Sequence, residues 1–172
     1  MKPLRDVIAP GLDVIFCGIN PSLLSAERGH HFARPGNRFW PALHGSGFTD
    51  RLLSPDEDAL VLEYGFGITN MVDRPTRAAD ELSVEEMRAG GGALAELAAC
   101  FRPTVIAVVG LSAWRIAYGR PKASVGLQPE LVGGCSAWIL PNPSGLNAHY
   151  QLPDLIRLFA ELRNWVSISA AP

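Results

Sequence analysis

The sequence predicts a three-layer α/β/α sandwich around a central, mostly parallel sheet. Short β-branched, apolar runs alternate with segments of helical character along the chain, which is the pattern of parallel α/β folds. The first and the last of these runs each end in a loop of small residues, proline and asparagine. With 172 residues, 48% of them hydrophobic, the chain can bury a substantial core and is expected to form a single domain over 1–172.

Each element has its own signal. Apolar runs predict strands at 13–18, 66–71, 104–109 and 137–140. Apolar spacing and two capping boxes, at 54–57 and 83–86, predict helices at 37–45, 54–64, 83–101, 112–118 and 152–166. The third helix contains Gly90-Gly91-Gly92, which should weaken it, since each glycine costs roughly 1 kcal/mol relative to alanine. Residues 19–36 are expected to form a long polar loop, and 119–134 a loop with a short strand.

Charge and cysteine content narrow the classes of function. A net charge of −2 and a pI of about 6.1 argue against tight, non-specific binding to DNA phosphates. The three cysteines are scattered, so we expect neither a disulfide framework nor a four-cysteine metal or iron–sulfur site. The first eleven residues carry charges and two prolines instead of an apolar signal core, and no apolar run approaches the ~20 residues that span a bilayer. A cytoplasmic monomer without membrane contact is expected.

Two loops are predicted to lie side by side. Gly18-Ile19-Asn20-Pro21 follows the first strand, and Asn142-Pro143-Ser144-Gly145-Leu146 follows the last. The carboxyl ends of parallel strands share one rim, where α/β proteins bind their ligands. Amide side chains held beside prolines can hydrogen-bond a planar heterocycle such as a nucleobase. A basic cluster interleaved with aromatic residues over 28–40 adds a local nucleic-acid face to this prediction.

Six segments, in order, resemble the mismatch-specific uracil-DNA glycosylases and thymine-DNA glycosylases, a branch of the uracil-DNA glycosylase superfamily. They span nearly the whole chain and comprise Gly18-Ile19-Asn20-Pro21, Gly29-His30-His31-Phe32, Pro35-Gly36-Asn37-Arg38-Phe39-Trp40, Gly67-Ile68-Thr69-Asn70-Met71-Val72-Asp73-Arg74-Pro75-Thr76, Gly126-Leu127-Gln128-Pro129 and Asn142-Pro143-Ser144-Gly145-Leu146. The resemblance implies the glycosylase sandwich fold. It also implies hydrolysis of the bond between a mispaired uracil and its deoxyribose in double-stranded DNA, without metal or cofactor, by a protein used at the nucleoid.

The resemblance also implies roles for single residues. Asn20 matches the catalytic asparagine that positions the attacking water, and Leu146 matches the wedge that fills the space left by the flipped base. The remaining matches fall into two sets. Those expected to contact the substrate base are Ile19, His31, Phe32, Asn70, Thr76 and Asn142. Those expected to contact DNA are Ser144, Gly145 and Asn147, and Arg38 is expected to contact DNA as part of the basic cluster.

Three positions depart from the family pattern. Ser22 stands where glycine is common, and Ala148 stands where some members carry arginine. Asp80 stands where one branch has an amide, so a carboxylate near the pocket could activate water in place of Asn20; otherwise Asp80 lies on a solvated loop before the Ser83 cap. Three alternatives to excision of uracil opposite guanine stay open: a broader range of bases that includes thymine and hypoxanthine, a lesion-binding protein without catalysis, and a flavodoxin-like nucleotide sensor.

Overall fold

The computed structural model describes residues 3–169 and contains a five-stranded sheet with the strand order β2-β1-β3-β5-β4. Its strands are β1 (Val14–Gly18), β2 (Phe66–Asn70), β3 (Val105–Val109), β4 (Gly126–Leu127) and β5 (Ser136–Leu140). All neighbouring pairs are parallel except β4 with β5. The predicted α/β fold with a mostly parallel central sheet is therefore confirmed.

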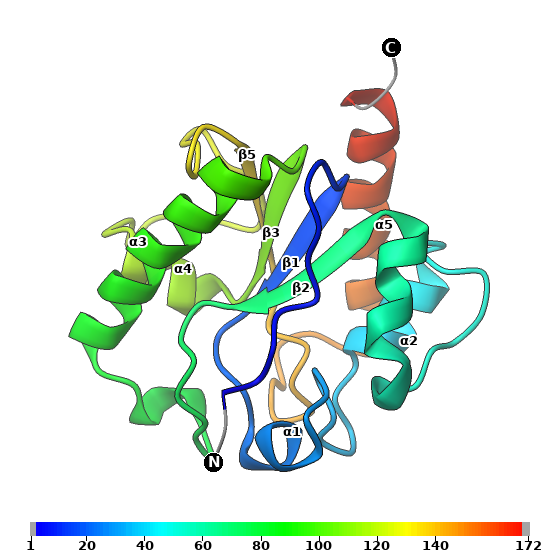
Figure 1. Ribbon diagram of the computed structural model, residues 1–172, viewed down its shortest axis with the longest axis horizontal. Helices are drawn as coiled ribbons and strands as arrows, with labels where there is room; N and C mark the ends of the chain where they lie inside the picture. The colour runs from blue at the N-terminus through cyan, green and yellow to red at the C-terminus, as the bar shows by residue number, and fades with distance from the viewer. Residues whose placement is uncertain (1–2, 170–172) are drawn as a thin grey trace.

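Helices cover both faces of the sheet (Figure 1). One layer holds α3 (Val84–Phe101) and α4 (Leu111–Ala117); the other holds α2 (Phe39–Gly45) and α5 (Leu152–Ser169). Alternating strand residues supply the two cores: Ile15 packs toward α3 and α4, while Phe16 packs toward α2 and α5. Phe16 lies 5.4 Å from Phe39 in an edge-to-face contact and is stacked on Phe159, so aromatic packing joins β1 to both helices of the second layer.

Two of the predicted elements need correction. The expected loop 19–36 contains a helix, α1 (Leu23–Arg28), whose N-cap is Ser22 and whose C-cap is Gly29 in the left-handed conformation. Ser22 thus has a local role where the family commonly has glycine. The element after Ser54 has the predicted bounds, but it is a 3₁₀ helix, η1 (Pro55–Tyr64), with non-helical torsions at Glu57.

Two glycines of the run expected to weaken α3 lie where this helix is in close contact with its neighbours. A Cβ placed on Gly90 would lie 2.4 Å from the carbonyl oxygen of Met71, and one on Gly91 would lie 3.2 Å from Ala117. The helix continues without interruption through both positions. Close packing against the segment after β2 and against α4 therefore outweighs the low helix propensity of glycine.

The strand order places the two motif loops at one edge of the sheet. Gly18 pairs with Asn70 in the parallel register of β1 and β2, so the ends of both strands coincide.

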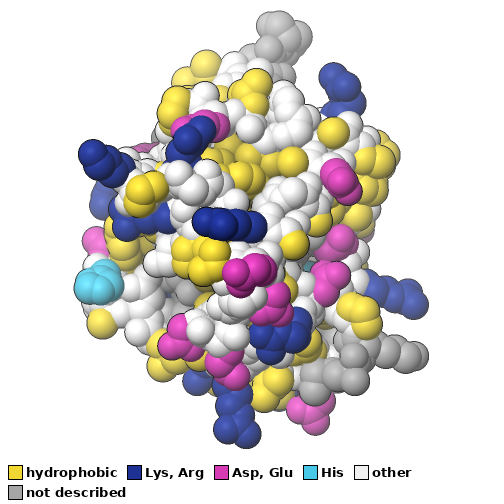
Figure 2. Space-filling model, turned by 90° about the vertical axis from the view of Figure 1, so that its left-hand side faces the viewer, with side chains coloured by type: hydrophobic (Ala, Val, Ile, Leu, Met, Phe, Trp, Pro, Cys, Tyr) yellow, Lys and Arg dark blue, Asp and Glu magenta, His cyan; other side chains and the backbone are white. Residues whose placement is uncertain are grey.

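The face seen in Figure 2 carries acidic and basic side chains intermixed, with no extended region of one sign. Within residues 3–169, none of the helices is long and apolar enough to cross a membrane.

Candidate active site

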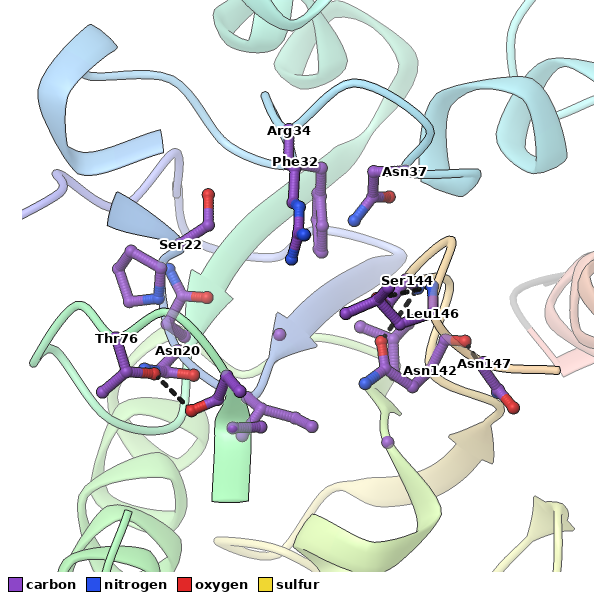
Figure 3. A pocket seen from close by; sticks show the side chains of 18 of the residues that line it. Asn20, Ser22, Phe32, Arg34, Asn37, Thr76, Asn142, Ser144, Leu146 and Asn147 are labelled. Atoms are coloured by element: carbon purple, nitrogen blue, oxygen red, sulfur yellow. Dashed lines mark hydrogen bonds between the residues drawn. The ribbon is translucent and has the colours of Figure 1, made fainter. Parts of the chain in front are cut away.

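A cavity of about 940 Å³ opens at the carboxyl ends of the strands. Figure 3 shows Asn20 and Thr76 on one wall, the segment from Asn142 to Asn147 on the opposite wall, and Phe32 between them. All the residues predicted to bind the base line this cavity, and so do Ser144, Leu146, Asn147 and Asp80. The two motif loops therefore do meet.

Asn20 is held by one end of its amide only. Its Nδ2 donates to the carbonyl oxygen of Arg74 and to Oγ1 of Thr76, both at 2.8 Å. Because a carbonyl oxygen can only accept, the nitrogen must face Arg74. The amide oxygen has no hydrogen-bond partner among residues 3–169 and is left as an acceptor at a cavity-lining position.

The segment that orients Asn20 is tied to α3. Arg74 pairs with Glu86 through two hydrogen bonds, of 2.6 and 3.0 Å, and donates to the carbonyl of Glu81. The guanidinium and the Ser83 cap together lower the pKa of Glu86 to about 2. Both side chains are partly exposed, so this pair contributes little to stability by itself. Its effect is to fix the path of the backbone that presents the Arg74 carbonyl to Asn20.

Phe32 forms an aromatic wall of the cavity. Its backbone has a φ of 52°, which is rare for a bulky residue, and its ring stacks on Phe39 at 4.0 Å. A Cβ on Gly18 would lie 3.4 Å from the Phe32 ring and 2.6 Å from Oδ1 of Asn70. Glycine at the end of β1 is therefore needed for these two side chains to approach the cavity floor together.

His31 determines the orientation of Asn70. It is 1% exposed, and its Nε2 lies 2.9 Å from the carbonyl oxygen of Arg5, so Nε2 carries the proton. Burial lowers the pKa of His31 and favours this neutral ring. Its Nδ1 then has a lone pair, 3.4 Å from Nδ2 of Asn70, and the Asn70 oxygen lies beside Gly18. A second asparagine thus offers an acceptor to the cavity.

Asp58, a residue that sequence reasoning missed, anchors the loop before Phe32. Asp58 is 5% exposed, and its carboxylate accepts from the backbone N–H of His31 at 2.9 Å and lies 3.2 Å from Nδ1 of His30. Ser25, also buried, accepts from the N–H of Ala33 on the other side of Phe32. No motif indicated either residue; the only signal was that Asp58 follows a capping box and would turn inward on η1.

The last motif folds on itself through its polar side chains. Asn142 accepts at Oδ1 from the N–H of Ser144 at 3.0 Å, while its own carbonyl accepts from Nδ2 of Asn147. The amide nitrogen of Asn142 has no partner among the described residues, so it is left as a donor. Leu146 is 70% exposed at the tip of this loop.

The surroundings of Arg38 differ from those expected, whereas Asp80 lies exposed before the Ser83 cap, as one of its two interpretations predicted. Arg38 is half-buried, and its guanidinium donates to carbonyl oxygens of the loop carrying Leu146 rather than facing outward. Asp80 is exposed on the short 3₁₀ helix η2 (Ala79–Glu81), at the cavity rim and without a hydrogen bond of its own in the described chain. Within residues 3–169 there is no group of three or more His, Cys, Asp or Glu side chains arranged to hold a metal ion.

Comparison with known proteins identifies the family. The sequence profile described as "Uracil DNA glycosylase superfamily" matches residues 5–165. The chain belongs to the uracil DNA glycosylase superfamily. A solution NMR structure of a "putative Uracil DNA glycosylase" from Methanosarcina acetivorans is similar in fold, with a TM-score of 0.61, 17% sequence identity, and coverage of 94% of this chain and 98% of that one.

The superfamily membership confirms the broader part of the resemblance. Its finer part, the mismatch-specific and thymine-processing branch, stays a prediction. The geometry nevertheless assembles most of the residues assigned from that branch around one cavity, with Asn20 and Leu146 on opposite sides.

Proposed function

We propose that this protein is a monofunctional glycosylase that removes uracil mispaired with guanine from double-stranded DNA and leaves an abasic site. The observation that carries the proposal is the orientation of Asn20, whose nitrogen is bound by the protein and whose oxygen is left as an acceptor at the cavity. An amide so held can receive a hydrogen bond from a water molecule and direct the water's lone pair at the sugar.

The cavity suits a base taken out of the duplex. Extrusion costs a few kcal/mol, least for a mispaired base, and Leu146 is placed to fill the vacated space. The flipped base would lie against the ring of Phe32, which lines the cavity. Oδ1 of Asn70 would accept from the ring N–H of uracil, where cytosine has a bare nitrogen, so cytosine would leave this oxygen unpaired. The donor of Asn142 would bind a base carbonyl.

The chemical step breaks the C1′–N1 bond and forms a bond from C1′ to the water oxygen. The electron pair of the broken bond stays on the base, and positive charge develops on the sugar. The backbone N–H of Phe32 has no partner among the described residues and is a candidate to stabilise the base anion. An amide is not a base at neutral pH, so the water's proton passes to solvent or to the departing base rather than to Asn20.

Single-turnover cleavage of a duplex panel tests the proposal. The substrates are U·G, U·A, T·G and hypoxanthine·T duplexes and single-stranded uracil DNA, with wild type, Asn20→Ala and Asp80→Ala. We expect the highest rate on U·G, with loss in Asn20→Ala and retention in Asp80→Ala. Loss in Asp80→Ala alone would transfer water activation to the carboxylate. Absence of cleavage on every substrate would favour a lesion-binding protein, and cleavage of T·G would extend the range to thymine.

A further inference from the structure

Arg38 connects two segments that are more than a hundred residues apart in the sequence. It is the N-cap residue of α2, and its Nη2 donates to the carbonyl oxygens of Ser144 at 2.7 Å and Asn147 at 3.1 Å. Its Nη1 donates to the carbonyl of Tyr150, and both its Nε and its backbone N–H donate to that of Pro143. One side chain thus binds four carbonyl groups of a single loop.

This loop lacks regular structure of its own. It runs from the end of β5 at Leu140 to the start of α5 at Leu152, and it carries Leu146. A Cβ on Gly145 would lie 2.8 Å from the carbonyl oxygen of Gly36, so the loop also packs tightly against the segment just before Arg38. The two contacts hold the loop to the same short stretch of chain.

The donor geometry explains why this residue is arginine. A guanidinium has five N–H groups in a rigid fork, and all three of its nitrogens are used here, in four hydrogen bonds. A lysine ammonium offers its three donors from one point and cannot reach carbonyls on opposite sides of the loop. No carboxylate lies within 4.0 Å of Arg38 in the described chain, so carbonyl oxygens alone surround the charge.

We propose that Arg38 is a positioning residue that presets the conformation of the loop carrying Leu146, rather than a contact to the DNA phosphates. This inference rests on the proposed function, in which Leu146 enters the duplex. A loop already folded in its inserting shape loses little conformational entropy on binding. We call the contacts from Arg38 to these four carbonyl groups the clamp. Loss of the clamp should impair the cleavage of duplexes, where a base must be displaced from its pair, and should spare the cleavage of single strands, where there is no pair to open.

Single-turnover rates of Arg38→Ala and Arg38→Lys test the clamp on U·G duplexes and on single-stranded uracil DNA. We expect both variants to lose about 10–100-fold on the duplex and to change little on the single strand, since a misplacement of about 1 Å costs up to about 100-fold. Arg38→Ala should add little to the loss caused by Leu146→Ala, because both act through the same side chain. Arg88→Ala, an exposed arginine on α3 without a hydrogen bond in the described chain, is the matched control.

The salt dependence of duplex binding separates the clamp from a phosphate contact. A lost phosphate contact lowers the slope of log K against log salt by about 1, and Arg38→Lys would then behave like wild type. The clamp predicts an unchanged slope and a lysine variant as defective as the alanine one. Equal losses of cleavage rate on duplex and single-stranded DNA would overturn the clamp. A lower salt slope together with a lysine variant that behaves like wild type would also overturn it.

Hydrogen exchange of the loop provides a test without catalysis. The clamp predicts faster exchange of the backbone amides of 144–149 in Arg38→Ala, with the rest of the chain unchanged. Unchanged exchange would refute the clamp even if the wild type cleaves DNA. If the wild type cleaves no substrate while this local change appears, the proposed function fails and the clamp on the loop stands.

Discussion

Thr76→Val tests how far catalysis depends on the orientation of one amide. The Thr76 hydroxyl accepts from Nδ2 of Asn20 and donates to the carbonyl of Ala78, both at 2.8 Å. Thr76 is 4% exposed, and valine has nearly the same shape. The substitution therefore removes two hydrogen bonds without opening a large cavity or adding bulk.

The expected loss of rate depends on the hydrogen bond that Asn20 keeps when the Thr76 hydroxyl is removed. A neutral hydrogen bond contributes about 1 kcal/mol, and a buried group left without a partner costs about 1–3 kcal/mol. Because the carbonyl of Arg74 still holds Asn20, we expect the lower part of that range: the transition state should lose about 1–2 kcal/mol of stabilisation. This corresponds to a rate about 5–30-fold lower. Thr76→Ser keeps the hydroxyl and should keep most of the rate.

The assay is single-turnover cleavage of a U·G duplex with enzyme in excess, so that product release does not enter the rate. Thr76→Val should have no further effect in an Asn20→Ala background, since no amide remains to be oriented. A wild-type rate in Thr76→Val, or an equal loss in both backgrounds, would refute the idea that Thr76 acts through Asn20.

Three further predictions concern the rest of the cavity. Gly18→Ala should lower the single-turnover rate at least about 10-fold by displacing Asn70, whereas Gly92→Ala, whose Cβ meets nothing within 4 Å, should keep full activity. Asp58→Ala should lower the free energy of unfolding in urea by about 1–3 kcal/mol, and Asp58→Asn by less, because an amide oxygen can still accept from the N–H of His31. Burial lowers the pKa of His31 from 6.5, so below pH 6.5 the unfolded chain binds more protons than the folded one. The melting temperature should therefore fall as the pH drops below 6.5, and a melting temperature that stays constant down to about pH 5 would contradict this. The cleavage rate depends on the ring in the folded protein, so His31 should lower it only at the lower pH where the folded-state ring takes up its proton.

The location of the site could be predicted because it depends on a rule about strands. Parallel strands end at one edge, so the loops that carry Asn20 and Asn142, each just after an apolar run, had to lie near one another. The fold class followed from the same alternation of strands and helices. These parts of the structure depend on periodicity, which a sequence shows directly.

The supporting contacts could not be predicted because they join positions without a shared pattern. The partners of Asn20 lie 54 and 56 residues further along the chain, and the carbonyls bound by Arg38 are peptide groups that every residue possesses. Arg38 looked like a DNA contact because it stands in a basic cluster, and only the fold shows where its donors point. The six-residue helix α1 was missed for a related reason: one turn and a half gives too few apolar positions to establish a period.

The three cavity asparagines show how neighbouring groups of known polarity orient amide side chains, each of which has both a donor and an acceptor end. The nitrogens of Asn20 and Asn70 face acceptors, the Arg74 carbonyl and His31 Nδ1, while the oxygen of Asn142 faces the N–H of Ser144. The ends left over are two acceptors and one donor. A water molecule needs the first acceptor to be oriented, and a uracil presents an N–H and a carbonyl to the other two groups. The cavity thus has a defined hydrogen-bonding pattern, although none of its three amides has one alone. Replacing any of these amides by a side chain of the opposite polarity should lower the cleavage rate more than replacing it by alanine.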